Sequence, residues 1–160
     1  MKHSTVSLLL AIPLLLAGCQ GGLRPLSGIN QQLARQGSSQ AGSLAGNWLA
    51  LIASRSSGRP QVQLIALNRG TPEPLPGLNR ADSLPISVAV DERGERLAVV
   101  RQRDDHTELV LYRRSLMASQ TIAMEPPGVP RQLSLSADGR VLAVEVSRGG
   151  LWQVDLLELP

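Results

Sequence analysis

The stretch PISVAVDERGERLAVV, Pro85 to Val100, decides the fold, because its pattern returns forty-five positions later as PRQLSLSADGRVLAVE, Pro130 to Glu145. In each copy a proline opens a run in which apolar and polar residues alternate. A polar turn with a glycine follows, and then Leu-Ala-Val. Such a run predicts a half-buried strand, and the turn predicts a hairpin. A fainter third copy, GNWLALI, begins at Gly46.

The two clear copies keep one spacing through three strands. In the first strand, alternation is expected to place Ile86, Val88 and Val90 on one face. Six apolar positions recur at the same offset: Val88, Val90, Leu97, Val99, Leu109 and Leu111 correspond to Leu133, Leu135, Leu142, Val144, Val154 and Leu156. A slip of one residue would turn each apolar set to the wrong face, so the shared spacing indicates repeats of one structural unit.

The remaining strand signals fit the same unit. The first copy aligns when Leu49 is placed on Leu97, with one extra residue in its hairpin, although its first strand is not recognisable. The segment TPEPLPG, Thr71 to Gly77, carries three prolines and predicts an edge strand or an extended connector. Further strands are expected at Trp48–Ala53, Val62–Leu67, Arg96–Arg101, Ser119–Met124, Leu142–Val146 and Trp152–Leu157.

A period of about 40–45 residues with several short strands per unit is typical of β-propellers. The continuous apolar runs LALI and LAVV indicate inner strands that are buried on both faces. We therefore predict an all-β domain of about three propeller-type blades of antiparallel strands, as a partial propeller or a compact β-array. Propellers usually have about four to eight blades. The sequence therefore leaves two alternatives for the exposed blade faces. Either two copies associate head to tail into a six-bladed ring, or the chain is a monomeric array in which residues 20–45 cover one end.

The third copy resembles the TolB-like propeller repeat. Its Ser136, Asp138, Gly139, Leu142 and Ala143 match the family pattern, whereas Ala137 stands where the family prefers proline and Leu135 where it prefers an aromatic residue. The second copy keeps the equivalent glycine and Leu-Ala but has Asp-Glu-Arg before the glycine. Over Asn47 to Pro160 the resemblance implies a β-propeller whose activity is protein binding in the bacterial envelope.

The N-terminus has the layout of a secretory signal, with Lys2 and His3 before the apolar run Val6 to Leu16. The stretch Leu16-Ala17-Gly18-Cys19 resembles a bacterial lipobox, and Cys19 is the only cysteine of the chain. The resemblance implies a signal peptide over residues 1–18 and a Cys19 that carries acyl chains, including palmitate, as a membrane anchor. It places the protein in the cell envelope, facing the periplasm or the cell surface. The alternative is an ordinary signal peptide with a chance cysteine.

Domain boundaries follow from composition. Residues 19–45 are rich in Gly, Ser and Gln and predict a lipidated N-terminus and flexible tether, in which QGSSQAG (residues 36–42) has linker composition. A short helix at Ile29 to Arg35 is expected within it. Residues 46–160 form the predicted β-repeat domain.

No set of residues predicts chemistry. His106 beside Asp104 and Asp105 is interpreted as a solvated turn, because a metal or catalytic site needs further ligands. Trp48, Trp152 and Tyr112 are candidate interaction residues for a carbohydrate or protein, with blade-interface packing as the alternative. Arg101, Arg103, Arg113 and Arg114 are a candidate basic patch or solvated strand ends.

The expected function is that of a membrane-anchored, non-catalytic scaffold for another envelope protein, without a cofactor. The alternative is a small-ligand or glycan binder, or the remnant of a propeller enzyme. Basic and acidic residues, 16 and 13, are interspersed and aromatic residues are few, which disfavours a nucleic-acid partner. The expected partner is an envelope protein of unknown identity, and a homodimer of this chain is a further expected assembly.

Overall fold

The computed structural model describes residues 22–54 and 58–160, which form one helix and three antiparallel sheets. The helix is α1 (Ser27–Arg35), close to the predicted Ile29–Arg35. In each sheet the strands follow one another in chain order. The first sheet consists of β1 (Ser38–Ala45), β2 (Trp48–Ser54), β3 (Gln61–Ala66) and β4 (Pro72–Glu73). The second sheet consists of β5 (Ser83–Val90), β6 (Arg96–Arg103), β7 (His106–Arg113) and β8 (Ala118–Ile122). The third sheet consists of β9 (Val129–Leu135), β10 (Val141–Arg148) and β11 (Leu151–Glu158). The all-β prediction is confirmed.

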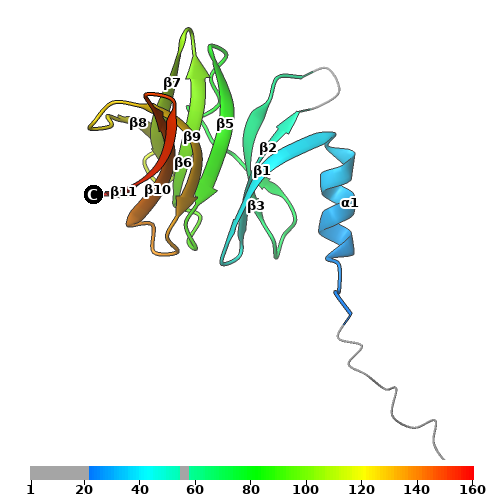
Figure 1. Ribbon diagram of the computed structural model, residues 1–160. Coiled ribbons are helices and arrows are strands. Elements are labelled where there is room, and N and C mark those ends of the chain that lie inside the picture. Colours follow the sequence, from blue (N-terminus) through cyan, green and yellow to red (C-terminus); the bar gives the residue numbers. More distant parts are fainter. Residues whose placement is uncertain (1–21, 55–57) are drawn as a thin grey trace, which may run out of the picture.

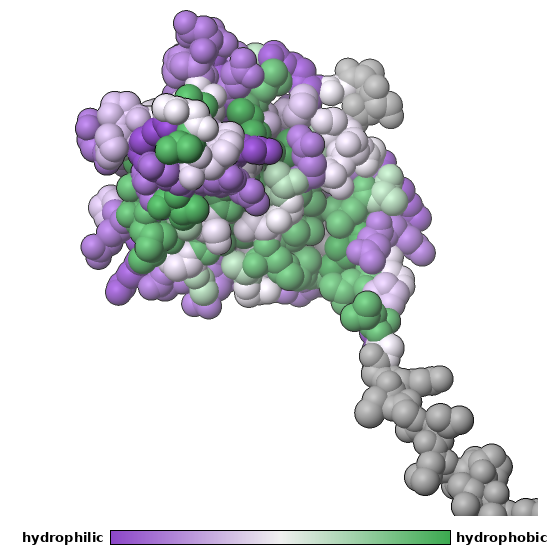
Figure 2. Space-filling view, in the orientation of Figure 1, coloured by the Kyte–Doolittle hydropathy of each residue, from purple (hydrophilic) through white to green (hydrophobic). Residues whose placement is uncertain are grey.

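The three sheets stack face to face, with α1 at one end of the stack and the third sheet at the other (Figure 1). In the same orientation, apolar surface is visible over the third sheet at the left and near α1 at the right (Figure 2). One apolar cluster joins the first and second sheets and includes Ile52, Leu64 and Leu97. A second cluster joins the second and third sheets and includes Val100, Leu111 and Leu142. The second sheet is therefore buried on both faces, which explains the continuous run LAVV in β6.

Strand pairing confirms the predicted repeat register. Val90 pairs with Leu97 in the second sheet, and Leu135 pairs with Leu142 in the third. On the next strand, Ala98 faces Leu111 and Ala143 faces Leu156, again at the same offset. In the first sheet Leu49 pairs with Ile65, and the equivalent residue of the second sheet, Leu97, pairs with Tyr112. The segment that joins Leu49 to Ile65 is one residue longer than the segment that joins Leu97 to Tyr112. The extra hairpin residue was therefore predicted correctly.

The alternation predicted for Ile86, Val88 and Val90 in β5 is wrong at Ile86. The register shifts between Pro85 and Ser87, so a β-bulge interrupts the strand there. Val88 and Val90 lie in the core between the first two sheets, but Ile86 is 38 % exposed. The extra residue of a bulge has no partner on the neighbouring strand, so the residues before it point to the opposite face from the one that strict alternation predicts.

The tether interpretation needs correction over residues 38–45. These residues form β1, which pairs with β2 from Ser38↔Ser54 to Ala45↔Trp48. β1 supplies the first strand that was not recognisable in the first copy, and the blade begins before Gly46. The segment forms a strand because its backbone pairs with β2, although its side chains are mostly exposed.

Helix α1 covers the outer face of the first sheet. Leu33 packs against a cluster formed by Leu51, Ala53 and Ile65. These side chains alternate with those that face the second sheet, so without α1 they would meet solvent. The N-terminal end of the stack is therefore covered by residues that precede the first blade.

Candidate functional site

An open groove of about 390 Å³ runs along the innermost strands of the three sheets, β1, β5 and β9. Among the described residues, each of these strands is paired with a single neighbouring strand, so its other edge has no sheet partner there. Leu44 and Ile86 line the groove and are 67 % and 38 % exposed. Polar side chains lie beside them, among them Arg131, Gln132 and Ser134. The groove thus offers apolar contacts and hydrogen-bonding groups together.

Serine side chains tie the innermost strands of adjacent sheets. The Val90 amide donates to Ser43 Oγ at 3.2 Å, which joins β5 to β1. The Leu133 amide donates to Ser87 Oγ at 3.2 Å, which joins β9 to β5. Each bond satisfies a strand-edge amide without requiring a continuous sheet. The groove wall is therefore held by direct links between blades.

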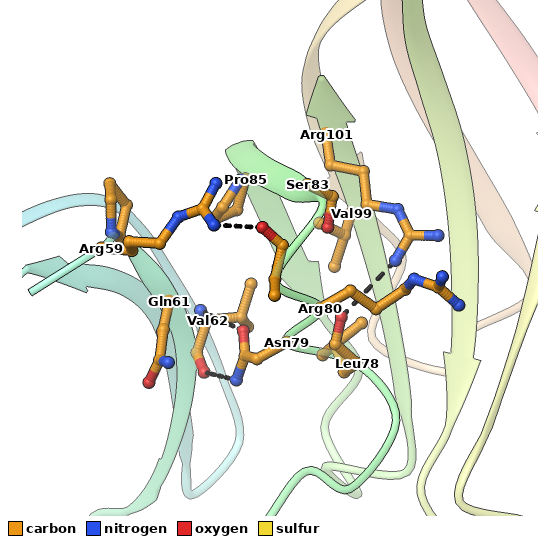
Figure 3. Close-up of a pocket in the computed structure, with 12 residues that line it drawn as sticks. Arg59, Gln61, Val62, Leu78, Asn79, Arg80, Ser83, Pro85, Val99 and Arg101 are labelled. Atoms are coloured by element: carbon orange, nitrogen blue, oxygen red, sulfur yellow. Dashed lines mark hydrogen bonds between the residues drawn. The ribbon is translucent and has the colours of Figure 1, made fainter. Parts of the chain in front are cut away.

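A smaller pocket of about 190 Å³ lies between the first and second sheets (Figure 3). The Asn79 side chain pairs with the backbone of Val62, accepting from its amide at 2.8 Å and donating to its carbonyl at 2.9 Å. The Arg59 guanidinium donates to the Ala81 carbonyl across the pocket. Both contacts join the first sheet to the segment that leads into β5, so they hold two blades together.

The other arginines of this pocket are matched by carboxylates. Arg101 is buried, and its Nε lies 2.6 Å from Glu108 Oε1. Arg80 makes two hydrogen bonds to the Asp82 carboxylate, at 2.9 and 3.0 Å. These bonds are the main cause that lowers the pKa of Asp82 to about 2. Ion pairing within the molecule therefore satisfies much of the polar character of the pocket.

The structure separates the predicted aromatic site residues. Trp48 packs against the core between the first and second sheets, with Arg114 4.5 Å from its ring centroid. Tyr112 is fully buried in the same core, and its hydroxyl donates to the Pro76 carbonyl at 3.0 Å. Trp152 lies on the third sheet, half exposed, with Arg131 5.1 Å from its ring centroid. Trp48 and Trp152 therefore do not share one platform.

The candidate basic patch does not form. Arg103 lies at the end of β6 that pairs with His106, whereas Arg113 lies at the opposite end of the hairpin and faces Arg96. Arg101 is buried against Glu108. Antiparallel pairing thus places Arg103 and Arg113 at opposite ends of the hairpin formed by β6 and β7.

His106 is the first residue of β7, directly after the turn at Asp104 and Asp105. Its Nδ1 is 3.3 Å from Asp105 Oδ1, and both side chains are exposed. Among the described residues, no group of three or more His, Cys, Asp or Glu side chains is arranged to hold a metal ion. The lipobox residues Leu16, Ala17, Gly18 and Cys19 lie outside the described residues.

The third sheet presents an exposed surface of the kind that a partial propeller without ring closure implies, although the sequence did not assign its residues. We call it the open face; it consists of Ser134, Ala143, Glu145, Trp152, Val154 and Leu156. Val154 and Leu156 are 68 % and 71 % exposed, whereas their equivalents in the second sheet, Leu109 and Leu111, are buried by the third sheet. The repeat register already contained this signal, since it assigns Val154 and Leu156 to positions that a following blade would cover.

Comparisons with known proteins agree with this geometry. No protein-family model matches the chain, and no curated protein does. Among solved structures it is similar to TolB from Acinetobacter baumannii, with 17% identity over 74% of this chain and 29% of that one and a TM-score of 0.56. It is also similar to the β-propeller domain of the Trilobed protease from Pyrococcus furiosus, described as having an open velcro topology, with 12% identity, coverage of 76% and 42% and a TM-score of 0.51.

A third similar structure is that of prolyl endopeptidases, with 11% identity, coverage of 83% and 24% and a TM-score of 0.52. The fold is that of consecutive β-propeller blades. At these identities the likeness establishes the fold alone. The chain spans less than half the length of each of these structures.

Within the described residues, the one helix is too short to cross a membrane.

Proposed function

We propose that this protein is a membrane-anchored lipoprotein that acts as a non-catalytic protein-interaction scaffold in the bacterial cell envelope. The lipobox-like stretch that ends at Cys19 supports the anchor. The TolB-like repeat pattern and the propeller fold support the scaffold, because the resemblance implies protein binding. Both features are compatible with a tethered domain that meets its partner at the membrane.

The inner groove carries the proposal. Within the described residues, it offers edges of β1, β5 and β9 that no further strand occupies, together with exposed Leu44 and Ile86. The edge amides of Val90 and Leu133 are already bonded to Ser43 and Ser87, so a peptide would use the remaining edge groups. An extended peptide can hydrogen-bond to such an edge while its side chains meet the apolar lining. The groove surface is mostly polar, so its hydrogen-bonding groups suit a peptide backbone, while Leu44 and Ile86 can contact apolar side chains of the same peptide.

A second candidate is a propeller unit that accompanies peptidase chemistry or binds a small ligand. The observation that favours it is that two of the three similar structures described above are of proteases or peptidases. The pocket beside Arg59 is the corresponding small-ligand site. Its arginines are engaged by Ala81, Asp82 and Glu108, which makes it the weaker candidate.

Photo-cross-linking in growing bacteria tests the scaffold. A photoreactive amino acid at Leu44 or Ile86 is expected to give a discrete protein adduct, because both side chains line the groove. The matched control is Leu116, which is exposed in the turn between β7 and β8, away from the groove. Adducts restricted to glycan or lipid, or equal adducts from the control, would contradict a protein-binding groove.

The anchor has its own test. Cys19→Ala removes the thiol that would carry the diacylglycerol, so we expect unprocessed precursor and no incorporation of labelled palmitate. The readouts are the apparent mass and the label after growth with the fatty acid. Processed, labelled material from this variant would refute the anchor and leave the scaffold proposal standing.

A further inference from the structure

The open face of the third sheet differs from other exposed surface because its equivalent on the second sheet is core. Ala98, Leu109 and Leu111 pack in the cluster between the second and third sheets. Their counterparts Ala143, Val154 and Leu156 have no sheet against them within the described residues, and the two larger side chains are about two-thirds exposed. Exposed apolar surface of this kind marks a site of association.

The other end of the stack does not offer a matching surface. There α1 places Leu33 on Leu51, Ala53 and Ile65. A second copy that approached head to tail would have to displace this helix before its third sheet reached the first sheet of its neighbour. The six-bladed head-to-tail ring considered from the sequence is therefore incompatible with α1 in place.

We propose that the open face binds the open face of a second copy, related by a two-fold axis. Such an isologous contact uses the same patch on both subunits and closes the assembly at a dimer. This contact covers the open face of both copies at once. A head-to-tail contact between two copies would cover the open face of one copy and leave that of the other exposed. The inference goes beyond the proposed scaffold, since it concerns self-association. Arg131 and Ser134 line both the groove and the proposed contact, whereas Leu44 and Ile86, which test the scaffold, take no part in the dimer.

The charges on and beside the open face are self-complementary. Arg131 lies over Trp152, and Glu145 lies on the neighbouring strand of the same sheet. A two-fold axis brings the arginine of each copy toward the acid of the other, so opposite charges meet twice. The same face repels itself if either charge is reversed alone.

The composition of the face fits an interface between folded chains. Positions that carry Ala89 and Val100 in the buried interface between blades carry Ser134 and Glu145 here. A surface that is also exposed before association needs polar groups to remain soluble, whereas a permanent core does not. Apolar Val154 and Leu156 beside polar Ser134 and Glu145 match that requirement.

Sedimentation velocity on residues 20–160 tests the proposal, since this segment contains every described element and no cysteine. We expect a dimer that dissociates on dilution. Val154→Arg and Leu156→Arg are expected to weaken the dimer by roughly tenfold or more, because they place a charge in its centre. The matched control Leu116→Arg, 62 % exposed in the turn between β7 and β8, is expected to remain dimeric.

A charge-swap cycle distinguishes the two-fold contact from other contacts. Glu145→Arg and Arg131→Glu should each yield monomer, and the double variant should recover the dimer, with circular dichroism confirming the fold of each. A monomeric wild type throughout the micromolar range would overturn the proposal. So would larger oligomers, or a double variant that stays monomeric while folded. None of these outcomes bears on adducts formed at Leu44 or Ile86, so the scaffold proposal is judged separately.

Discussion

Two residues with different side chains, Asp91 and Ser136, close equivalent hairpin turns. Asp91 Oδ1 accepts from the amides of Glu95 and Arg96 at 2.8 and 3.1 Å. Ser136 Oγ accepts from the amides of Arg140 and Val141 at 3.1 and 2.9 Å. The sequence predicted both turns from their glycines, but it treated Asp91 as a departure from the repeat pattern. The structure shows that an acceptor at this position is what the turn requires.

Gly94 in the first of these turns is predicted to be intolerant of a side chain. Its φ is 64°, and an added Cβ would overlap the ring of Trp48 from the first sheet. We expect Gly94→Ala to destabilise the protein by about 2–4 kcal/mol, from left-handed strain and overpacking together. Gly149→Ala, at φ 56° with nothing nearby, is expected to show only the strain of about 1–2 kcal/mol. Urea denaturation measures both, and equal losses would contradict the packing of Trp48 on Gly94.

Asp82 is predicted to titrate far below an ordinary aspartate. Its pKa is lowered to about 2, chiefly by the hydrogen bonds from Arg80. Because the folded-state pKa lies below the ordinary value of 3.8, the stabilising contribution is complete above that pH and is lost as pH falls through about 2. Arg80→Gln should raise the pKa of Asp82, as followed by NMR of the carboxyl carbon. An unchanged midpoint would show that Arg80 does not hold this carboxylate.

At the scale of elements, β1 shows where composition misleads. Gly, Ser and Gln in residues 36–42 predict a linker, yet pairing with β2 makes the segment a strand. A usable signal was present in the two residues Gly46 and Asn47, which join Ala45 to Trp48 and are typical of a tight hairpin turn. Helix α1 was predicted, but its contact with Leu51 and Ile65 depends on tertiary packing that a nine-residue pattern does not specify.

The buried pair of Arg101 on β6 and Glu108 on β7 is predicted to hold this hairpin. Removing one partner leaves a buried charge, so Arg101→Met should cost about 3–5 kcal/mol in free energy of unfolding. The double variant Arg101→Met, Glu108→Leu should recover most of that loss, because no unpaired charge remains. Thermal and urea denaturation report both. A double variant as unstable as the single one would mean that the loss comes from packing rather than from the charge.

At the scale of the whole molecule, the repeat register explains the stack and its asymmetry. The offset between Leu97 and Leu142 predicted blades of the same build, and the pairing confirms it. The repeat register did not reveal which end of the stack of sheets is covered, because that depends on where α1 lies. The result is a stack with a helix on its first sheet and exposed apolar side chains on its last, next to a groove lined by the innermost strands. Both proposals for this protein, a peptide-binding groove and a two-fold dimer, start from that arrangement.

Methyl nuclear Overhauser spectroscopy on protein with labelled Leu and Val tests the stacking most directly. The account predicts contacts from Val100, Leu109 and Leu111 of the second sheet to Leu142, Val144 and Val146 of the third. It also predicts that Val154 and Leu156 give no contact to methyls of the second sheet in the same chain, because they point away from it. If contacts appear within each sheet while those between the second and third sheets are missing, or if Val154 and Leu156 contact Leu109 and Leu111 of their own chain, the blade-on-blade arrangement is wrong.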